Sequence, residues 1–409
     1  MEALFTQALG LEPPWEVVDL KFSPEARRID FQVACPAGAA HACPACGAGE
    51  TAVHDWKARS WRHLDFFQYE AYLHAEVPRV KCAHCGQVSQ VALPWARPGS
   101  RFTLLFEAWV VGLAPLMSVA ALARQLRTGD DPLWRILKHH VEAARARESH
   151  AAVAVIGVDE TAAKRGQRYI SVFYDLPASR LLFATEGRGK DSFGQFVADF
   201  AAHGGAPGAI RHVSMDMSTA YQAGVAEQLP QASVGFDRFH VVALASEALD
   251  AVRRAEQRRV PELKGSRWGL LKKPADWNRA QWDTMHWLQR STLQSARGWR
   301  LKEALRAIYR TARSPDEARP LLERWHSWAR RCRLEPFKKL AHTLKRHWDG
   351  VLNGFRAGCH NGRVEAMNRA LQEARARARG YRRTDNFISM AYLIAGKLAH
   401  LPKSPFATA

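Results

Sequence analysis

The sequence contains no run of about 20 consecutive apolar residues, the length that a helix needs to cross a membrane. Its N-terminal stretch, MEALFTQALGLEPPW, also lacks the basic segment and apolar core of a secretory signal peptide. We therefore expect a cytoplasmic protein without a membrane span.

Acidic residues are scarce relative to basic ones. The 40 Asp and Glu residues face 59 Lys and Arg residues, so the formal net charge is +19 and the pI is near 10.0. Such an excess predicts a polyanionic partner, and because arginines are mixed with aromatic residues nucleic acid is the leading candidate. Hydrophobic residues make up 47% of the 409 residues, enough for two or three folded domains.

Cysteine is also scarce, and its spacing argues against a disulfide framework. Four of the seven cysteines form two CxxC pairs, each followed by a glycine that can adopt the positive φ of a tight turn: Cys43, Cys46, Cys82 and Cys85. Strand-like runs over 56–63 and 69–80 would bring the two turns together. Four sulfur ligands leave no open position for a substrate, so the pattern predicts one structural Zn²⁺. Alternative ligands are Cys35, His41 and His84.

A helix-turn-helix is predicted directly after this ribbon. An apolar helix over 102–111 precedes two short helices, 118–126 and 132–144, that flank a Gly-containing turn, and Ser118 is the expected N-cap. The second helix carries the residues expected in a DNA groove: Arg135, Lys138, His139 and His140. The alternative is a helical pair that only packs on the neighbouring domain.

The central part of the chain has the pattern of a ribonuclease-H-like sheet. An apolar run over 153–158 leads to Asp159, and a later apolar run over 210–217 contains Asp216 near its end. The order is three strands, a helix, a strand, a helix and a strand, and in this fold strands one and four are adjacent. We therefore expect Asp159 and Asp216 to be neighbours. Glu160 and Asp237 are competing carboxylates.

Long, Arg-rich helices are expected from about 243 to 355. Eight tryptophans are scattered through them, and we expect these to build the core of a helical insertion rather than to stack on bases. Glu365 follows in the first turns of a new helix, with Asn368 and Arg369 on the same face. A basic strip follows from Arg375 to Arg383, and we expect Arg369, Arg375 and Arg379 to contact DNA.

Two aspartates and one glutamate suit hard divalent cations, since Mg²⁺ selects oxygen ligands. If Asp159, Asp216 and Glu365 converge, they can hold two Mg²⁺ ions for phosphodiester cleavage or transfer, with Mn²⁺ as a substitute.

The chain resembles the DDE transposases of the ISL-three family of bacterial insertion sequences. The resemblance covers nearly the full length and rests on these stretches: CPACG, CAHCG, GVDE, Asp216, DRFH at 237–240, NGRVEAMNR at 361–369, and RARARGYRR. It implies an RNase-H-like catalytic domain with a helical insertion, and catalytic positions at Asp159, Asp216 and Glu365. It also implies a double-stranded DNA partner, with Mg²⁺-dependent cleavage at terminal inverted repeats followed by joining to target DNA.

The predicted architecture is therefore multidomain α+β, with a zinc ribbon, a helix-turn-helix and an RNase-H-like α/β domain with an all-α insertion. The expected boundaries are 1–97 for the hairpin and ribbon, 98–148 for the helix-turn-helix, 151–242 with 356–400 for catalysis, and 243–355 for the insertion. A homodimer is expected, because two element ends must be handled together. The alternatives are a DNA-binding protein that has lost catalysis and a nuclease that cuts without joining.

Overall fold

The computed structural model describes residues 1–36, 38–164, 168–187, 189–356 and 362–404. The chain divides into two compact units, residues 1–140 with 400–409 and residues 141–399. Within the described part, no helix has the combination of length and apolar character that a bilayer crossing needs.

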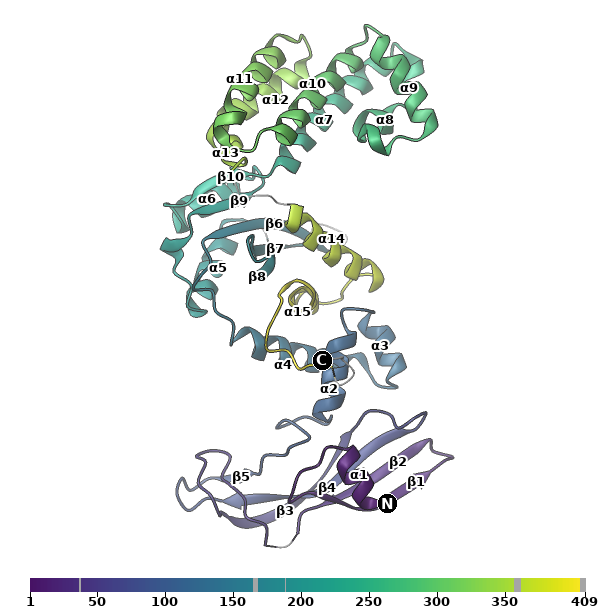
Figure 1. Ribbon diagram of the computed structural model, residues 1–409, viewed down its shortest axis with the longest axis vertical. Helices are drawn as coiled ribbons and strands as arrows, with labels where there is room; N and C mark the ends of the chain where they lie inside the picture. Colours follow the sequence, from purple (N-terminus) through teal and green to yellow (C-terminus); the bar gives the residue numbers. More distant parts are fainter. Residues whose placement is uncertain (37, 165–167, 188, 357–361, 405–409) are drawn as a thin grey trace. The chain divides into compact units, whose positions relative to one another are not determined.

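The first unit contains a five-stranded sheet with the order β1-β2-β4-β3, in which β5 pairs with β4 (Figure 1). Its elements are α1 (Glu2–Ala8), β1 (Glu16–Ser23), β2 (Arg28–Ala34), β3 (Ala52–Arg62), β4 (Glu70–Lys81) and β5 (Val88–Gln90). The expected N-terminal hairpin is confirmed as the antiparallel β1-β2 pair. Strand β2 also pairs in parallel with β4, so the hairpin extends the ribbon sheet. Phe31, Leu73 and Trp61 are buried in its core.

Three helices follow: α2 (Leu104–Leu113), α3 (Val119–Gln125) and α4 (Asp130–Arg145). Ser118 is the N-cap of α3 as expected, and its hydroxyl accepts a hydrogen bond from the backbone N–H of Ala121 at 3.3 Å. In the turn between α3 and α4, Arg127 adopts a left-handed φ of 51°. These helices form the predicted helix-turn-helix.

The second unit is organised around a sheet with the order β10-β9-β6-β7-β8. Its strands are β6 (Val155–Lys164), β7 (Arg168–Asp175), β8 (Arg180–Glu186), β9 (His212–Met215) and β10 (Ser233–Phe236). Strands β6, β7 and β8 are antiparallel neighbours, whereas β9 pairs in parallel with both β6 and β10. The predicted adjacency of the first and fourth strands is confirmed, and the order is that of the ribonuclease H fold.

Helices cover the sheet of the second unit on two faces: α5 (Lys190–Ala202), α6 (Thr219–Gln228), α14 (Gly362–Arg377) and α15 (Thr384–Ala395). Phe173 of β7 stacks on Phe196 of α5 with ring centroids 4.4 Å apart. One residue further along β7, the hydroxyl of Tyr174 reaches Asn368 of α14. Because successive strand residues point to opposite faces, α5 and α14 cover opposite sides of the sheet.

The helical insertion lies between β10 and α14 (Figure 1). Its α-helices are α7 (Arg238–Gln257), α8 (Arg267–Leu271), α9 (Arg279–Arg290), α10 (Gln294–Thr311), α11 (Pro315–Arg331), α12 (Glu335–Arg346) and α13 (Trp348–Asn353). The core contains apolar residues from most of these helices, such as Leu249, Leu305 and Phe337.

The expectation that the tryptophans of the insertion build its core is wrong for half of them. Trp325 and Trp348 are buried, and Trp277 and Trp299 pack against the core. Four others are 42–55% exposed: Trp268, Trp282, Trp287 and Trp328. Smaller residues fill the corresponding core positions, among them Met285 and Leu288 of α9. Periodicity could not separate these groups, because short amphipathic helices carry indoles on both faces.

Candidate active site and zinc site

Three aspartates follow the parallel-paired segments of β6, β9 and β10, and Asp159 lies inside β6 because this strand continues beyond its pairing with β9. Asp216 directly follows β9, and Asp237 directly follows β10. Gly157 of β6 pairs with Ser214 of β9 in parallel register. Two residues further along each chain, Asp159 therefore lies beside Asp216. The backbone N–H of Asp237 donates to the carbonyl of Met215 at 2.9 Å, which joins the third strand end to the second.

Two hydrogen bonds hold the Asp159 carboxylate. Its Oδ1 accepts from the backbone N–H of Glu160 at 2.7 Å, and its Oδ2 accepts from the side-chain amide of Asn368 at 2.6 Å. The Asn368 carbonyl oxygen in turn accepts from the hydroxyl of buried Tyr174 at 2.7 Å. This relay fixes both the orientation of Asp159 and the position of α14. The helical spacing predicted that Asn368 lies on the same face as Glu365, but nothing in the sequence indicated that Tyr174 would contact it.

Burial raises the pKa of Asp159 to about 6, and the negative charges of Asp237 and Asp216 act in the same direction. The Glu160 N–H and the nearby His240 oppose this shift. A group of half-buried acidic side chains that repel one another fits a site for hard cations.

In metal-free protein, we expect the effect of Asp159→Asn on the free energy of unfolding to become more favourable by about 2 kcal/mol from acidic to neutral pH, because the variant cannot ionise at this position. The folded carboxyl binds its proton more tightly than the unfolded one, with pKa values of about 6 and 3.8. The stability contributed by this proton is therefore fully present below the unfolded pKa of 3.8, and it is lost as the pH rises through the folded pKa of about 6. Denaturant melts in chelator at several pH values measure the difference.

The matched control is Asp283→Asn, which changes an exposed carboxylate of α9 and should have little effect on unfolding. An equal stabilisation by Asp159→Asn at acidic and neutral pH would contradict the electrostatic explanation.

Glu365 lies in the first turn of α14, where the sequence placed it. Burial raises the pKa of Glu365, and the charge of Asp237 adds to this, whereas Arg238 and Arg369 lower it. Asp237 and His240 therefore act on both Glu365 and Asp159. The helix that carries Glu365 is the same one that holds Asp159 through Asn368. Asn361, which opens the motif, lies outside the described residues.

Gly157 allows α14 to approach β6 closely. A Cβ atom at this position would lie 2.6 Å from Cδ2 of Leu176 and 3.1 Å from Cγ2 of Val364, the residue before Glu365. Side chains from β6 and α14 also meet further along, where Nε2 of Gln372 donates to the carbonyl of Ala162 at 3.3 Å. The missing side chain at position 157 thus sets the distance between the sheet and the glutamate helix.

We expect Gly157→Ala to destabilise the protein by about 1–3 kcal/mol, because α14 or Leu176 must move. DNA cleavage should fall more than DNA binding does, since Glu365 shifts with Val364. A thermal melt and a cleavage assay on the same preparation measure both effects. Gly194→Ala is the control, because a Cβ atom there has no neighbour within 4 Å.

The two competing carboxylates have different surroundings. The side chain of Glu160 interacts with Tyr221 of α6, on the sheet face opposite to α14. Asp237 is buried, caps α7 by accepting from the N–H of Phe239 at 3.1 Å, and lies 3.9 Å from Nε2 of His240. Asp237 therefore shares the acidic edge with Asp159 and Asp216, whereas Glu160 faces the other side.

Asp216 is held by a backbone group. The N–H of Ser218, the N-cap residue of α6, donates to Oδ1 of Asp216 at 2.9 Å, and the Ser218 side chain makes no cap hydrogen bond.

The four predicted zinc ligands converge in the first unit. All four Sγ atoms lie within 4.8 Å of one another, with Cys43 3.8 Å from Cys85 and Cys46 3.6 Å from Cys82. A tetrahedron with Zn–S bonds of about 2.3 Å has S–S edges of about 3.8 Å, so the donors fit Zn²⁺. Gly47 and Gly86 adopt φ values of 75° and 74°, as the turns require.

Cys35 and His41, the alternative ligands, contact each other instead, with Sγ 3.9 Å from Nε2. Within the described residues, the cysteine cluster contains neither of them and does not contain His84.

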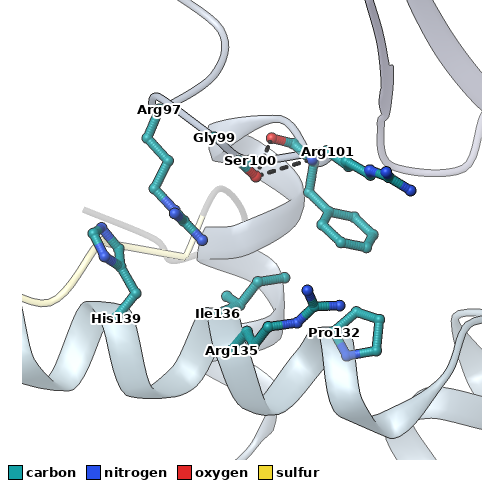
Figure 2. Close-up of a pocket in the computed structure, with 9 residues that line it drawn as sticks. Arg97, Gly99, Ser100, Arg101, Pro132, Arg135, Ile136 and His139 are labelled. Atoms are coloured by element: carbon teal, nitrogen blue, oxygen red, sulfur yellow. Dashed lines mark hydrogen bonds between the residues drawn. The ribbon is translucent and has the colours of Figure 1, made fainter.

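A cationic pocket of about 660 Å³ lies between the segment 97–102 and helix α4. Figure 2 shows the basic side chains around it: Arg97, Arg101, Arg135 and His139. Arg135 and His139 are exposed, and Lys138 is half-buried. The surface of α4 that carries the predicted DNA contacts therefore opens into this pocket.

His140 was also predicted to enter a DNA groove, but its side chain points to Glu107. Its Nε2 lies 2.7 Å from the fully buried carboxylate of Glu107, which also accepts from Nε of Arg97 at 2.8 Å and from the Ser100 hydroxyl at 2.6 Å. Burial would raise the pKa of Glu107, but these three donors hold it below its usual range. His140 thus stabilises the pocket wall.

Arg375 contacts the sheet of its own unit, and its predicted contact with DNA stays a prediction. It is half-buried, and its guanidinium donates to the carbonyl of Ala162 at 2.6 Å, which fastens α14 to β6. Arg369 and Arg379 are exposed.

Comparison with known families identifies three matched segments. A transposase family of the ISL3 type matches residues 156–391, more than half of the 409-residue chain. The helix-turn-helix domain of transposase family ISL3 matches residues 91–141, and the zinc-finger of transposase IS204/IS1001/IS1096/IS1165 matches residues 39–85. The chain belongs to the ISL3 family of transposases.

Two relatives support this assignment over nearly the full length. The chain is 30% identical to the transposase for insertion sequence element IS1557 of Mycobacterium tuberculosis, over 98% of this chain and 97% of the relative. It is 28% identical to the transposase for insertion sequence element IS1001 of Bordetella parapertussis, over 84% of this chain and 86% of the relative.

The resemblance inferred from the sequence is therefore confirmed. This ISL3 transposase has a zinc ribbon whose matched segment contains all four clustered cysteines, which supports a structural Zn²⁺. Its helix-turn-helix is a DNA-binding domain, and its largest matched segment supports a DNA-cutting enzyme.

Proposed function

We propose that this ISL3 transposase binds the terminal inverted repeats of its insertion sequence and catalyses Mg²⁺-dependent cleavage and strand transfer. The observation that carries the proposal is the acidic edge formed by Asp159 and Asp216, with Glu365 on the helix packed against it. A chain that only bound DNA would have no need for half-buried carboxylates that repel one another.

In this proposal, Asp159, Asp216 and Glu365 hold two Mg²⁺ ions. The ions, when bound, activate the attacking oxygen and stabilise the leaving oxygen of the phosphodiester. Mn²⁺ has similar ligand preferences and should replace Mg²⁺.

The protein's own groups would orient this site before DNA arrives. Tyr174 and Asn368 keep one Asp159 oxygen directed at α14, and the Ser218 N–H holds one oxygen of Asp216. Arg369 and Arg379 are exposed on and just after α14, where they can contact phosphates flanking the scissile bond. Strand transfer requires carboxylates in fixed positions beside exposed arginines that can bind the DNA backbone.

A joining assay tests the proposal. Labelled duplexes that carry an element end are incubated with Mg²⁺ and a target plasmid, and strand-transfer product is measured on a gel. Cleavage without joining would favour a nuclease, and binding without any cleavage in Mg²⁺ or Mn²⁺ would favour a DNA-binding protein that has lost catalysis. A homodimer, proposed because two ends must be held together, is tested by light scattering with end-bearing DNA.

For the helix-turn-helix, we expect Arg135→Gln to weaken end binding and to reduce the slope of log K against log salt by about 0.9, the contribution of one phosphate contact. Fluorescence anisotropy at several salt concentrations measures both quantities. Arg124→Gln is the control, since Arg124 is an exposed residue of α3 that does not line the pocket of Figure 2. An unchanged salt slope would remove Arg135 from the DNA interface.

A further inference from the structure

A second cationic pocket lies in the helical insertion, far along the sequence from the carboxylates and the helix-turn-helix. It has a volume of about 330 Å³, at the lower end of the roughly 300–1,000 Å³ range of ligand pockets. Helix α10 and the end of helix α11 form it. The lining residues include four arginines and one exposed tryptophan: Arg297, Arg300, Arg331, Arg333 and Trp328.

Among the described residues, the arginines of this pocket have no acidic partner. No acidic residue lines the pocket, and none of the four arginines forms an ion pair with a carboxylate in the part of the chain that the structure describes. Two of them make only backbone contacts nearby, Arg300 to the carbonyl of Gln289 at 2.8 Å and Arg331 to the carbonyl of Ser327 at 3.2 Å. All four arginine side chains belong to exposed residues. Such a concentration of positive charge favours an anionic ligand.

Helix stability does not explain these positions. Basic residues near the C-terminal end of α11, such as Arg331, are favoured by the helix dipole. Arg297, however, lies in the first turn of α10, where the dipole disfavours positive charge. Arg297 therefore needs another reason to be there, and an anion between the two helices provides one.

The tryptophan narrows the class of anion. Trp328 is 43% exposed, whereas Trp325, one turn earlier in α11, is buried and donates through its indole N–H to the carbonyl of Leu301 at 2.8 Å. This bond fixes α11 against α10 and so holds Trp328 at the pocket. An exposed indole among arginines is the combination that binds single-stranded nucleic acid, with a base on the ring and phosphates on the guanidinium groups.

We propose that this pocket binds a single-stranded segment of DNA, with an unpaired base stacked on Trp328 and the adjoining phosphates on Arg297, Arg300, Arg331 and Arg333. The proposal rests on the DNA strand cleavage proposed above, because cutting an element end exposes unpaired nucleotides. The pocket would bind the displaced strand at a site separate from the acidic edge. Duplex DNA presents its bases only at frayed ends, so the pocket should prefer single strands.

Cys332 lines the same pocket and serves as a local reporter. We expect a short oligothymidine to slow alkylation of Cys332 by iodoacetamide several-fold in the full-length protein, as read by peptide mass spectrometry. The control is Cys35, a half-buried cysteine of the first unit, whose alkylation rate should not change.

Trp328→Ala should weaken oligothymidine binding about tenfold, the loss of one base stack. The pair Arg297→Gln with Arg331→Gln should weaken it further and lower the salt slope by about 1.4, or about 0.7 for each phosphate contact of a single strand. Matched controls are Trp282→Ala on α9 and Arg324→Gln on α11, which are exposed and do not line the pocket.

Unchanged binding in the Trp328 and arginine variants, or unprotected Cys332, would overturn the proposal. Loss in the arginine variants alone, with equal competition by duplex, would overturn the assignment of an unpaired base. Binding of end-bearing duplex and its cleavage are measured in parallel with wild-type protein. If wild-type protein binds and cuts element ends while the pocket variants bind oligothymidine as well as wild type does, only the single-strand site is refuted. If wild-type protein neither binds nor cuts element ends, the proposed transposase function itself is refuted.

Discussion

Asp159→Asn, Asp216→Asn and Glu365→Gln are each expected to reduce cleavage of end-bearing DNA on the order of a thousandfold, or about 4 kcal/mol in the activation barrier. Each change preserves the shape of the side chain and removes a negative oxygen that would hold a metal ion. Binding to the same DNA should persist, because the helix-turn-helix belongs to the other compact unit. Single-turnover cleavage and anisotropy with the same substrate measure the two activities.

Two further variants make this prediction discriminating. Glu160→Gln changes a carboxylate that faces α6 and should leave cleavage within a few-fold of wild type. Asp237→Asn changes a carboxylate of the acidic edge that influences both Asp159 and Glu365, so we expect an intermediate loss. Full activity of Glu365→Gln together with an inactive Asp237→Asn would replace Glu365 by Asp237 in the catalytic set.

Removing the structural zinc is the second change with a large expected effect. Cys82→Ser should abolish binding of one Zn²⁺ per chain and unfold the ribbon between Cys43 and Cys85, because zinc sites of this kind contribute on the order of 10 kcal/mol of folding free energy. The S–S distances of 3.6 and 3.8 Å leave space for the ion only at the centre of the four thiolates. Metal analysis and limited proteolysis measure the two results.

The control for the zinc prediction is Cys332→Ser, a cysteine of the insertion outside the cluster, which should retain full metal content. A Cys82→Ser protein that keeps stoichiometric zinc and a protease-resistant ribbon would show that Cys35, His41 or His84 takes over as a ligand.

Local signals in the sequence were sufficient for the metal ribbon. A CxxC pair followed by glycine encodes its own turn, so both knuckles adopt the same hydrogen bonds, from Gly47 to Cys43 at 2.8 Å and from Gly86 to Cys82 at 2.9 Å. Strand periodicity was equally informative for β6 to β10, since alternation predicts which residues share a face. The Ser118 cap belongs to the same class of local signals.

Side-chain direction on short helices was not predictable in this way. The sequence gives the same residue type to buried Trp325 and exposed Trp328, and only the packing of α10 against α11 separates them. His140 and Arg375 likewise had the right charge for DNA, and they bind Glu107 and Ala162. Contacts between segments far apart in the chain decided these three cases.

The sequence by itself determined the family, the zinc ligands, the strand order and the three acidic candidates, because each depends on residue type and near-neighbour spacing. Tertiary structure alone decided that Asp237 joins the acidic edge, that Tyr174 and Asn368 orient Asp159, and that arginines of two helices surround Trp328. The physical reason is that hydrogen bonds and charge interactions act over a few ångströms in space, whereas the residues that make them here are separated by up to some two hundred positions along the chain.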